Sequence, residues 1–111
     1  MGKAVTSLDR MLCGMIEAVI LEEADRYVQF ATHDNAVRCE AAGDRNLEAP
    51  LANEALDKLE AIGFLPPNAA SAGNHWMELP RLPAVCLAKF AGKVLRMVYG
   101  IDLGLIQVTE V

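Results

Sequence analysis

The chain has 111 residues, of which 53% are hydrophobic and 23% are charged, and its net charge is −5. A composition of this kind predicts one globular domain, residues 1–111, with one hydrophobic core. Because a nucleic-acid backbone is bound through a basic surface, the acidic charge argues against nucleic acid as a partner.

Cysteine usage indicates a reducing compartment. The chain has three cysteines, Cys13, Cys39 and Cys86, which are far apart and form no Cys-x-x-Cys pair. This pattern predicts reduced, buried thiols in a cytoplasmic protein. The apolar stretch at 11–21 contains Glu17 and is short for a bilayer, so we expect neither a signal peptide nor a membrane partner.

Periodicity predicts an amphipathic helix over residues 6–24. Its apolar residues recur at steps of three and four and form one stripe: Leu8, Met11, Leu12, Met15, Ile16, Val19 and Ile20. Thr6, with Asp9 three residues later, is a candidate capping box. The polar side is acidic rather than rich in lysine, so we expect the helix to pack on protein and not on a membrane surface.

Alternation of apolar and polar residues predicts a β-hairpin that turns at Asp34 and Asn35. With a two-residue turn, Phe30 lies opposite Cys39 and His33 opposite Ala36. One face of this hairpin is then core, and its residues are Val28, Phe30, Thr32, Val37, Cys39 and Ala41. The other face is open and mostly polar, with Tyr27, Gln29, Ala31, His33, Arg38 and Glu40.

A second helix is predicted over residues 53–62. Its inward residues are Leu56, Leu59 and Ile62. Asn53 is the candidate N-cap, and Gly63 is placed to end the helix, with Phe64 folding back onto the last turn. After a Pro-Pro pair, the small and polar residues 68–74 predict a flexible loop.

Three further elements complete the predicted fold. Residues 75–80 alternate as a strand, Pro83 can open a third helix that Gly100 ends, and residues 105–111 suit a last strand. The inward stripe of the third helix is Leu87, Ala88, Ala91, Val94, Leu95 and Val98. A second apolar row on it is Cys86, Phe90 and Met97. The order α-β-β-α-β-α-β predicts an α+β fold, an antiparallel sheet with flanking helices.

The sequence predicts no reaction centre. Cys39 and His33 point to opposite faces of the hairpin, so they do not form a nucleophile–base pair, and Cys39 is interpreted as a core residue. Three scattered cysteines and two scattered histidines do not provide the local ligand pairs of a zinc site. We therefore expect a protein that is not an enzyme and that has no metal or cofactor.

The order and spacing of several short pieces resemble the TY-Chap family, the actinobacterial domains grouped with type III secretion chaperones and YbjN-like proteins. The resemblance covers residues 27–101. Its pieces are Tyr27-Val28-Gln29-Phe30-Ala31, Arg38-x-Glu40, Leu59-x-x-x-Gly63-Phe64-x-x-Pro67, Asn74-His75-Trp76 and Leu95-Arg96-x-Val98-x-Gly100-Ile101. Phe64 departs from the family, which usually has Trp after the helix-ending glycine. The resemblance implies a secretion-chaperone-like fold, often dimeric, and non-enzymatic binding of polypeptide segments.

We therefore predict a chaperone-like or adaptor domain that binds a polypeptide segment on its sheet and helices. The candidate partner-binding residues are Trp76, Phe90, Met97, Tyr27 and Gln29. Apolar burial would stabilise the complex, and main-chain pairing at a sheet edge would add to it. Two alternatives are a self-associating structural domain, such as a homodimer without a client, and a small enzyme or ligand-binding domain that uses Cys86 or Glu78.

Overall fold

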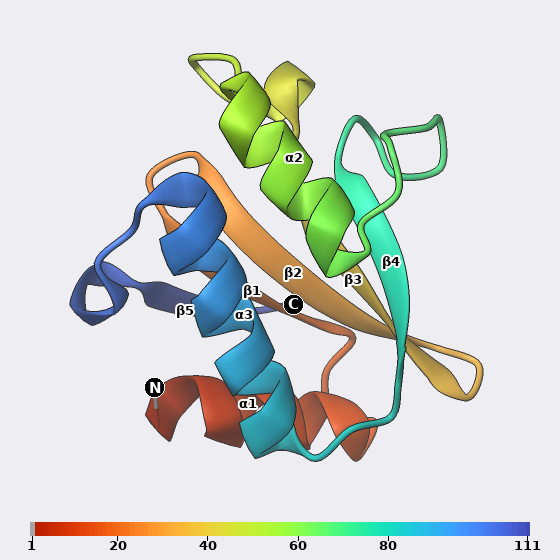
Figure 1. Ribbon diagram of the computed structural model, residues 1–111. Helices are drawn as coiled ribbons and strands as arrows, with labels where there is room; N and C mark the ends of the chain where they lie inside the picture. The colour runs from red at the N-terminus through yellow and green to blue at the C-terminus, as the bar shows by residue number, and fades with distance from the viewer. Residues whose placement is uncertain (1) are drawn as a thin grey trace.

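The computed structural model describes residues 2–111, in which three α-helices cover one face of a five-stranded antiparallel sheet (Figure 1). In chain order the elements are α1 (Gly2–Leu12), β1 (Ala18–Glu23), β2 (Arg26–His33), β3 (Ala36–Ala41), α2 (Asn53–Ile62), β4 (His75–Pro80), α3 (Ala84–Tyr99) and β5 (Gln107–Glu110), with short turns of 3-10 helix at Asp44–Asn46 and Leu103–Leu105. The strands lie in the order β4-β3-β2-β1-β5. The predicted α+β fold class is confirmed, with β1 as an additional strand.

The first predicted helix, residues 6–24, is wrong at both ends. The helix α1 begins at Gly2 and ends at Leu12, and Gly14 follows it with φ +78°. Residues 18–23 instead form β1, where Val19 lies opposite Phe30 of β2. The apolar steps fitted a helical period, but Ala18–Leu21 is a continuous apolar run that suits a buried strand as well as a helix. Pairing with strands on both sides decided the outcome.

The predicted helix caps also differ from the structure. Thr6 lies within α1, and its hydroxyl donates to the carbonyl of Gly2 at 3.1 Å, so it is not a cap. The N-cap of α2 is Ala52, which makes no side-chain hydrogen bond, rather than Asn53. Pro83 is the N-cap of α3, one residue before the helix begins.

The predicted hairpin is confirmed residue by residue. His33 lies opposite Ala36 and Phe30 lies opposite Cys39, as a two-residue turn requires. Asp34 adopts φ +53°, a left-handed conformation that Asp tolerates better than most residues. Phe30 and Cys39 are buried on the helix-covered face, whereas His33 is exposed.

The C-terminal end of α2 follows the prediction. Gly63 has φ +121°, and the amide of Phe64 donates to the carbonyl of Leu59 at 3.0 Å. The Phe64 side chain is buried against the core. This combination is a Schellman-type helix end, in which glycine accepts the positive φ and a following apolar residue folds back.

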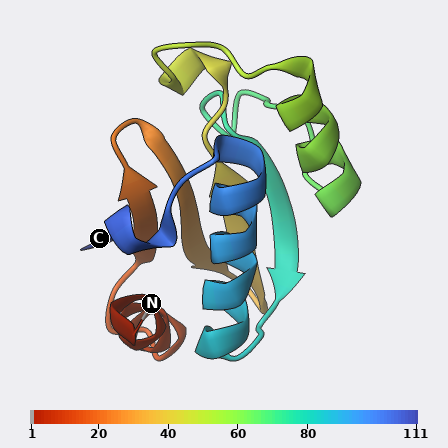
Figure 2. The same cartoon turned by 60° about the vertical axis from the view of Figure 1, so that its left-hand side comes forward.

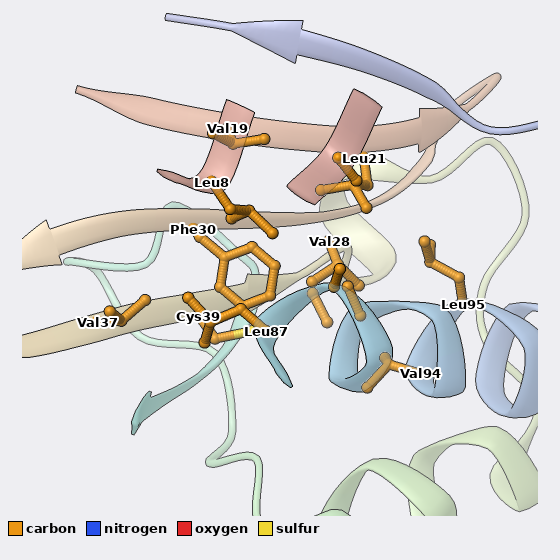
Figure 3. Close-up of a cluster of buried hydrophobic side chains, with 14 of the residues drawn as sticks. Leu8, Val19, Leu21, Val28, Phe30, Val37, Cys39, Leu87, Val94 and Leu95 are labelled. Atoms are coloured by element: carbon orange, nitrogen blue, oxygen red, sulfur yellow. The ribbon is translucent and has the colours of Figure 1, made fainter. Parts of the chain in front are cut away.

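The helix α3 is the centre of the helical layer. It lies across the sheet with α1 to one side and α2 to the other (Figure 2). Its predicted inward stripe is buried, and Leu87 joins Phe30 and Cys39 in the core cluster (Figure 3). At its end, the Tyr99 hydroxyl donates to the carbonyl of Ala42 at 2.6 Å, and burial raises the pKa of Tyr99 above its ordinary value.

The prediction of three buried thiols is correct only for Cys39. Its burial raises the pKa of the thiol, with a smaller contribution from the neighbouring Glu40 carboxylate. Cys13 is exposed because it lies in the turn after α1, and Cys86 is exposed because it lies on the solvent side of α3.

Candidate functional site

The five residues predicted to bind a partner lie on two separate surfaces. Tyr27, Gln29 and Trp76 lie on the face of the sheet that the helices leave uncovered, which we call the outer face. Phe90 and Met97 lie on α3, on the other side of the sheet. The structure therefore divides the predicted site into two candidate surfaces.

Glu40 of β3 is the central acceptor of a hydrogen-bond network on the outer face. Its carboxylate accepts from Arg38 Nε at 3.0 Å, from Gln29 Nε2 at 3.3 Å and from Asn74 Nδ2 at 3.0 Å. These groups satisfy one another, so this part of the outer face has few free donors and acceptors for a partner.

Asn74 ties the loop at 68–74 to this network. It is buried, and its Oδ1 accepts from the Tyr27 hydroxyl at 2.7 Å and from Asn46 Nδ2 at 2.9 Å. Burial raises the pKa of Tyr27, the bond to Asn74 lowers it, and the Glu40 carboxylate raises it, so the hydroxyl stays protonated and donates at neutral pH. The loop predicted as flexible is therefore anchored at this end.

Trp76 is partly exposed and makes contacts in three directions. Its indole lies under the guanidinium of Arg38, 4.6 Å from the ring centroid. Its Nε1 donates to the carbonyl of Pro66 at 3.1 Å, and its backbone exchanges hydrogen bonds with Leu65. Arg38 Nη2 is buried on this face and has no hydrogen-bond partner among residues 2–111.

The edges of the sheet offer little room for strand addition. On β4, Leu65 occupies the outward backbone groups of Trp76, and Pro80 has no amide hydrogen to donate. The other edge strand, β5, is four residues long. Main-chain pairing with a partner at either edge is therefore restricted.

The second surface is an open groove along α3, with a volume of about 460 Å³. We call it the α3 groove. Its lining residues come from α3, from Val5 of α1 and from Leu103 of the turn Leu103–Leu105. Its apolar lining residues are Val5, Val85, Ala88, Gly92, Met97 and Leu103.

The exposure of these residues distinguishes the α3 groove from ordinary surface. Val85 is 47% exposed and Met97 is 41% exposed, whereas Ala88 and Gly92 form a buried floor of small residues. Sequence analysis identified Met97 but missed Val85, although Val85, Ala88 and Gly92 recur at helical steps. Leu103 and Val5 gave no signal, because other elements bring them to α3.

Phe90, the other predicted residue on α3, does not line the groove. It is partly buried and stacks on Phe64 at the end of α2, with 6.2 Å between the ring centroids and 25° between the planes. Phe90 therefore contributes to the packing of α2 on α3, and of this predicted pair only Met97 lines the groove.

Three basic side chains complete the lining of the α3 groove. Lys89, Lys93 and Arg96 are exposed on α3 and line the groove together with its apolar residues. The groove thus combines apolar lining residues with three basic ones.

The groups that sequence analysis considered for chemistry are separated in the structure. Cys39 is buried on the helix-covered face, and His33 is exposed beside the hairpin turn. Cys86 lies on α3 and Glu78 on β4, on opposite sides of the sheet. Within residues 2–111, no three His, Cys, Asp or Glu side chains gather as a metal ion would require.

The fold, with its helices on one face of an antiparallel sheet, is the secretion-chaperone-like class expected from the sequence. The chain belongs to the TY-Chap3 family, described as the T3SS (YopN, CesT) and YbjN peptide-binding chaperone 3, whose family model matches residues 5–103. No curated protein and no solved structure matches the chain significantly. None of the helices in residues 2–111 has the length and apolar character that a membrane span needs.

Proposed function

We propose that this protein binds a segment of a partner polypeptide in the α3 groove and catalyses no reaction on it. Membership of a peptide-binding chaperone family supports a polypeptide as the ligand. The observation that carries the proposal is the apolar lining of the groove, in which Met97 and Val85 are nearly half exposed on the central helix.

Burial of the exposed apolar lining residues, Val85 and Met97, would provide the driving force. Apolar surface removed from water contributes about 25 cal/mol per Å², and exposed apolar patches rimmed by polar groups mark interaction sites. The groove is lined by two helices and a turn, so its shape is largely present before a partner binds. Such a surface suits an amphipathic segment whose apolar side faces the groove.

The proposal is tested with peptides selected against the purified protein. A displayed library of peptides about 15 residues long, enough for about four helical turns, is panned on the immobilised chain. Affinities of the selected peptides are then measured by fluorescence anisotropy for the wild type and for Met97→Asp. We expect Met97→Asp to weaken binding by at least about tenfold, because it places a charge in the apolar lining of the groove.

Met15→Asp is the matched control. Met15 is 64% exposed and does not line the groove, so the same substitution there should leave peptide affinity unchanged. Equal losses in both variants, or no peptide binding to the wild type, would contradict the proposal.

The outer face is the competing contact surface, because Tyr27, Gln29 and Trp76 remain predicted partner-binding residues.

The two alternative functions, a homodimer and a small enzyme, are tested on the same purified protein. Light scattering over a range of concentrations detects a homodimer that uses the exposed apolar residues of α3. Rapid and selective labelling of Cys86 near neutral pH would instead indicate a reactive thiol and revive the enzyme alternative.

A further inference from the structure

The helix α3 is basic in an acidic protein. The chain has 15 acidic and 10 basic residues, yet α3 contains Lys89, Lys93 and Arg96 and no Asp or Glu. Such a concentration of one charge sign on one helix is informative, because it opposes the sign of the whole chain.

The three bases lie on the groove side of α3 and are free to interact. Their spacings of four and three residues place them about one helical turn apart along one side. All three line the α3 groove and all three are exposed. Among residues 2–111, the ion pairs involve other side chains, so none of these three charges is neutralised within the chain.

The helix dipole does not account for this arrangement. A cation in the last turn of a helix offsets the partial negative charge there, which explains Arg96. Lys89 lies in the middle of α3, where the dipole effect is small. A nucleic-acid ligand is also disfavoured, because the net charge is −5 and the groove floor is apolar.

We propose that the occupant of the α3 groove is an acidic amphipathic helix; this inference rests on the proposed function. Its apolar stripe would cover Val85 and the small residues Ala88 and Gly92. Its Asp or Glu residues, repeated at steps of three and four, would pair with Lys89, Lys93 and Arg96, which follow Val85 around the helix. The small floor residues Ala88 and Gly92 allow a second helix to approach closely, near the lower end of the usual 8–10 Å between axes.

The inference is tested with three synthetic peptides of about 15 residues. The acidic peptide has Leu at steps of three and four, flanked by Glu. The basic peptide has the same Leu positions, with each Glu replaced by Lys. The third contains the residues of the acidic peptide in an order that removes the helical stripe. Binding is measured by fluorescence anisotropy at low and at physiological salt.

We expect the acidic peptide to bind best and to lose affinity as salt screens the charges. The variant K89E/K93E/R96E should lower the affinity for the acidic peptide by roughly 10- to 100-fold, because three attractions become repulsions. The same variant should raise the affinity for the basic peptide. The single variant Lys93→Glu should lower the affinity for the acidic peptide. Arg45→Glu makes the same change in net charge outside the groove and should leave this affinity unchanged. Circular dichroism confirms that each variant is folded.

The outcomes separate this inference from the proposed function. Equal binding of acidic and basic peptides, both weakened by Met97→Asp, would keep the proposed function and overturn the acidic occupant. Equal binding of the reordered peptide would overturn the amphipathic helix. Failure of all three peptides, together with a library that yields no binder, would overturn both proposals. Self-association that K89E/K93E/R96E abolishes would assign the groove to a second copy of the chain and overturn the inference.

Discussion

The guanidinium of Arg38 lies over the indole of Trp76, 4.6 Å from the ring centroid, and links β3 to β4 on the outer face. The same indole donates a hydrogen bond to the carbonyl of Pro66 at 3.1 Å. Trp76 therefore holds the segment that follows α2 against the edge of the sheet, and this explains why a large aromatic residue follows the loop at 68–74.

Replacement of Trp76 by Ala tests whether its role is structural. We expect Trp76→Ala to lower the free energy of unfolding by about 2 kcal/mol, from the lost cation–π contact, hydrogen bond and packing. Urea denaturation measures this change, and anisotropy with the acidic peptide should show unchanged affinity. Weaker peptide binding at unchanged stability would instead support Trp76 as a partner-binding residue.

Replacement of Phe90 separates packing from recognition on α3. Phe90 stacks on Phe64, so Phe90→Ala should lower the free energy of unfolding by about 2 kcal/mol, less than a fully buried Phe would cost. Chemical denaturation gives the change in stability. Peptide affinity, measured well below the denaturation midpoint, should stay close to that of the wild type. A tenfold loss of affinity in a fully folded variant would place Phe90 in the binding surface.

Gly43 is predicted to be intolerant of any side chain. A Cβ on Gly43 would overlap the carbonyl oxygen of Gly73, so Gly43→Ala should displace the loop at 68–74 and destabilise the fold by about 1–3 kcal/mol. Thermal unfolding followed by circular dichroism measures the effect. Gly2→Ala is the matched control, because its Cβ would meet no atom within 4 Å. Equal melting temperatures for wild type and Gly43→Ala would contradict the close contact.

His75 should make stability depend on pH. Burial lowers the pKa of His75, while the nearby Asp44 carboxylate partly opposes the shift. The unfolded chain, with a His pKa of about 6.5, then binds more protons than the folded chain in the window below that value. The stability that neutral His75 contributes to the fold is therefore fully present above about pH 6.5, and it is lost as the pH falls toward the pKa of His75 in the folded chain.

The measurement is urea denaturation between about pH 7.5 and pH 5.5, a range that brackets the unfolded pKa. The wild type should lose more stability across this range than the His75→Gln variant. The NMR signals of the His75 imidazole should give a pKa below the ordinary value for histidine. Identical pH dependence in the two proteins would exclude His75 as the cause.

Local signals in the sequence were sufficient for several elements. The turn at Asp34 and the alternation around it predicted the hairpin with its register, because a two-residue turn fixes which residues are opposite. Gly63 and Phe64 predicted the end of α2 for a similar reason, since the signal and the structure it specifies lie within a few residues. The open outer face and the buried stripe of α3 followed from periodicity.

The groove was only partly predictable. Met97 stood out as an apolar residue off the buried stripe. The groove is also lined by Val5, about 90 residues earlier in the chain, and by Leu103, a few residues later, and both belong to other elements. The anchoring of the loop at 68–74 was also invisible, because it depends on buried Asn74 meeting Tyr27 across the fold.

By itself, the sequence determined the fold class, the hairpin, the second and third helices and the family, because each rests on short-range patterns or on their order. Only the tertiary structure decided that residues 18–23 form a strand, since those residues suit either a helix or a strand until β2 and β5 pair with them. It also decided that the exposed side of α3 is part of a groove with apolar and basic lining, because that surface exists only where α1 and the turn Leu103–Leu105 pack beside the helix.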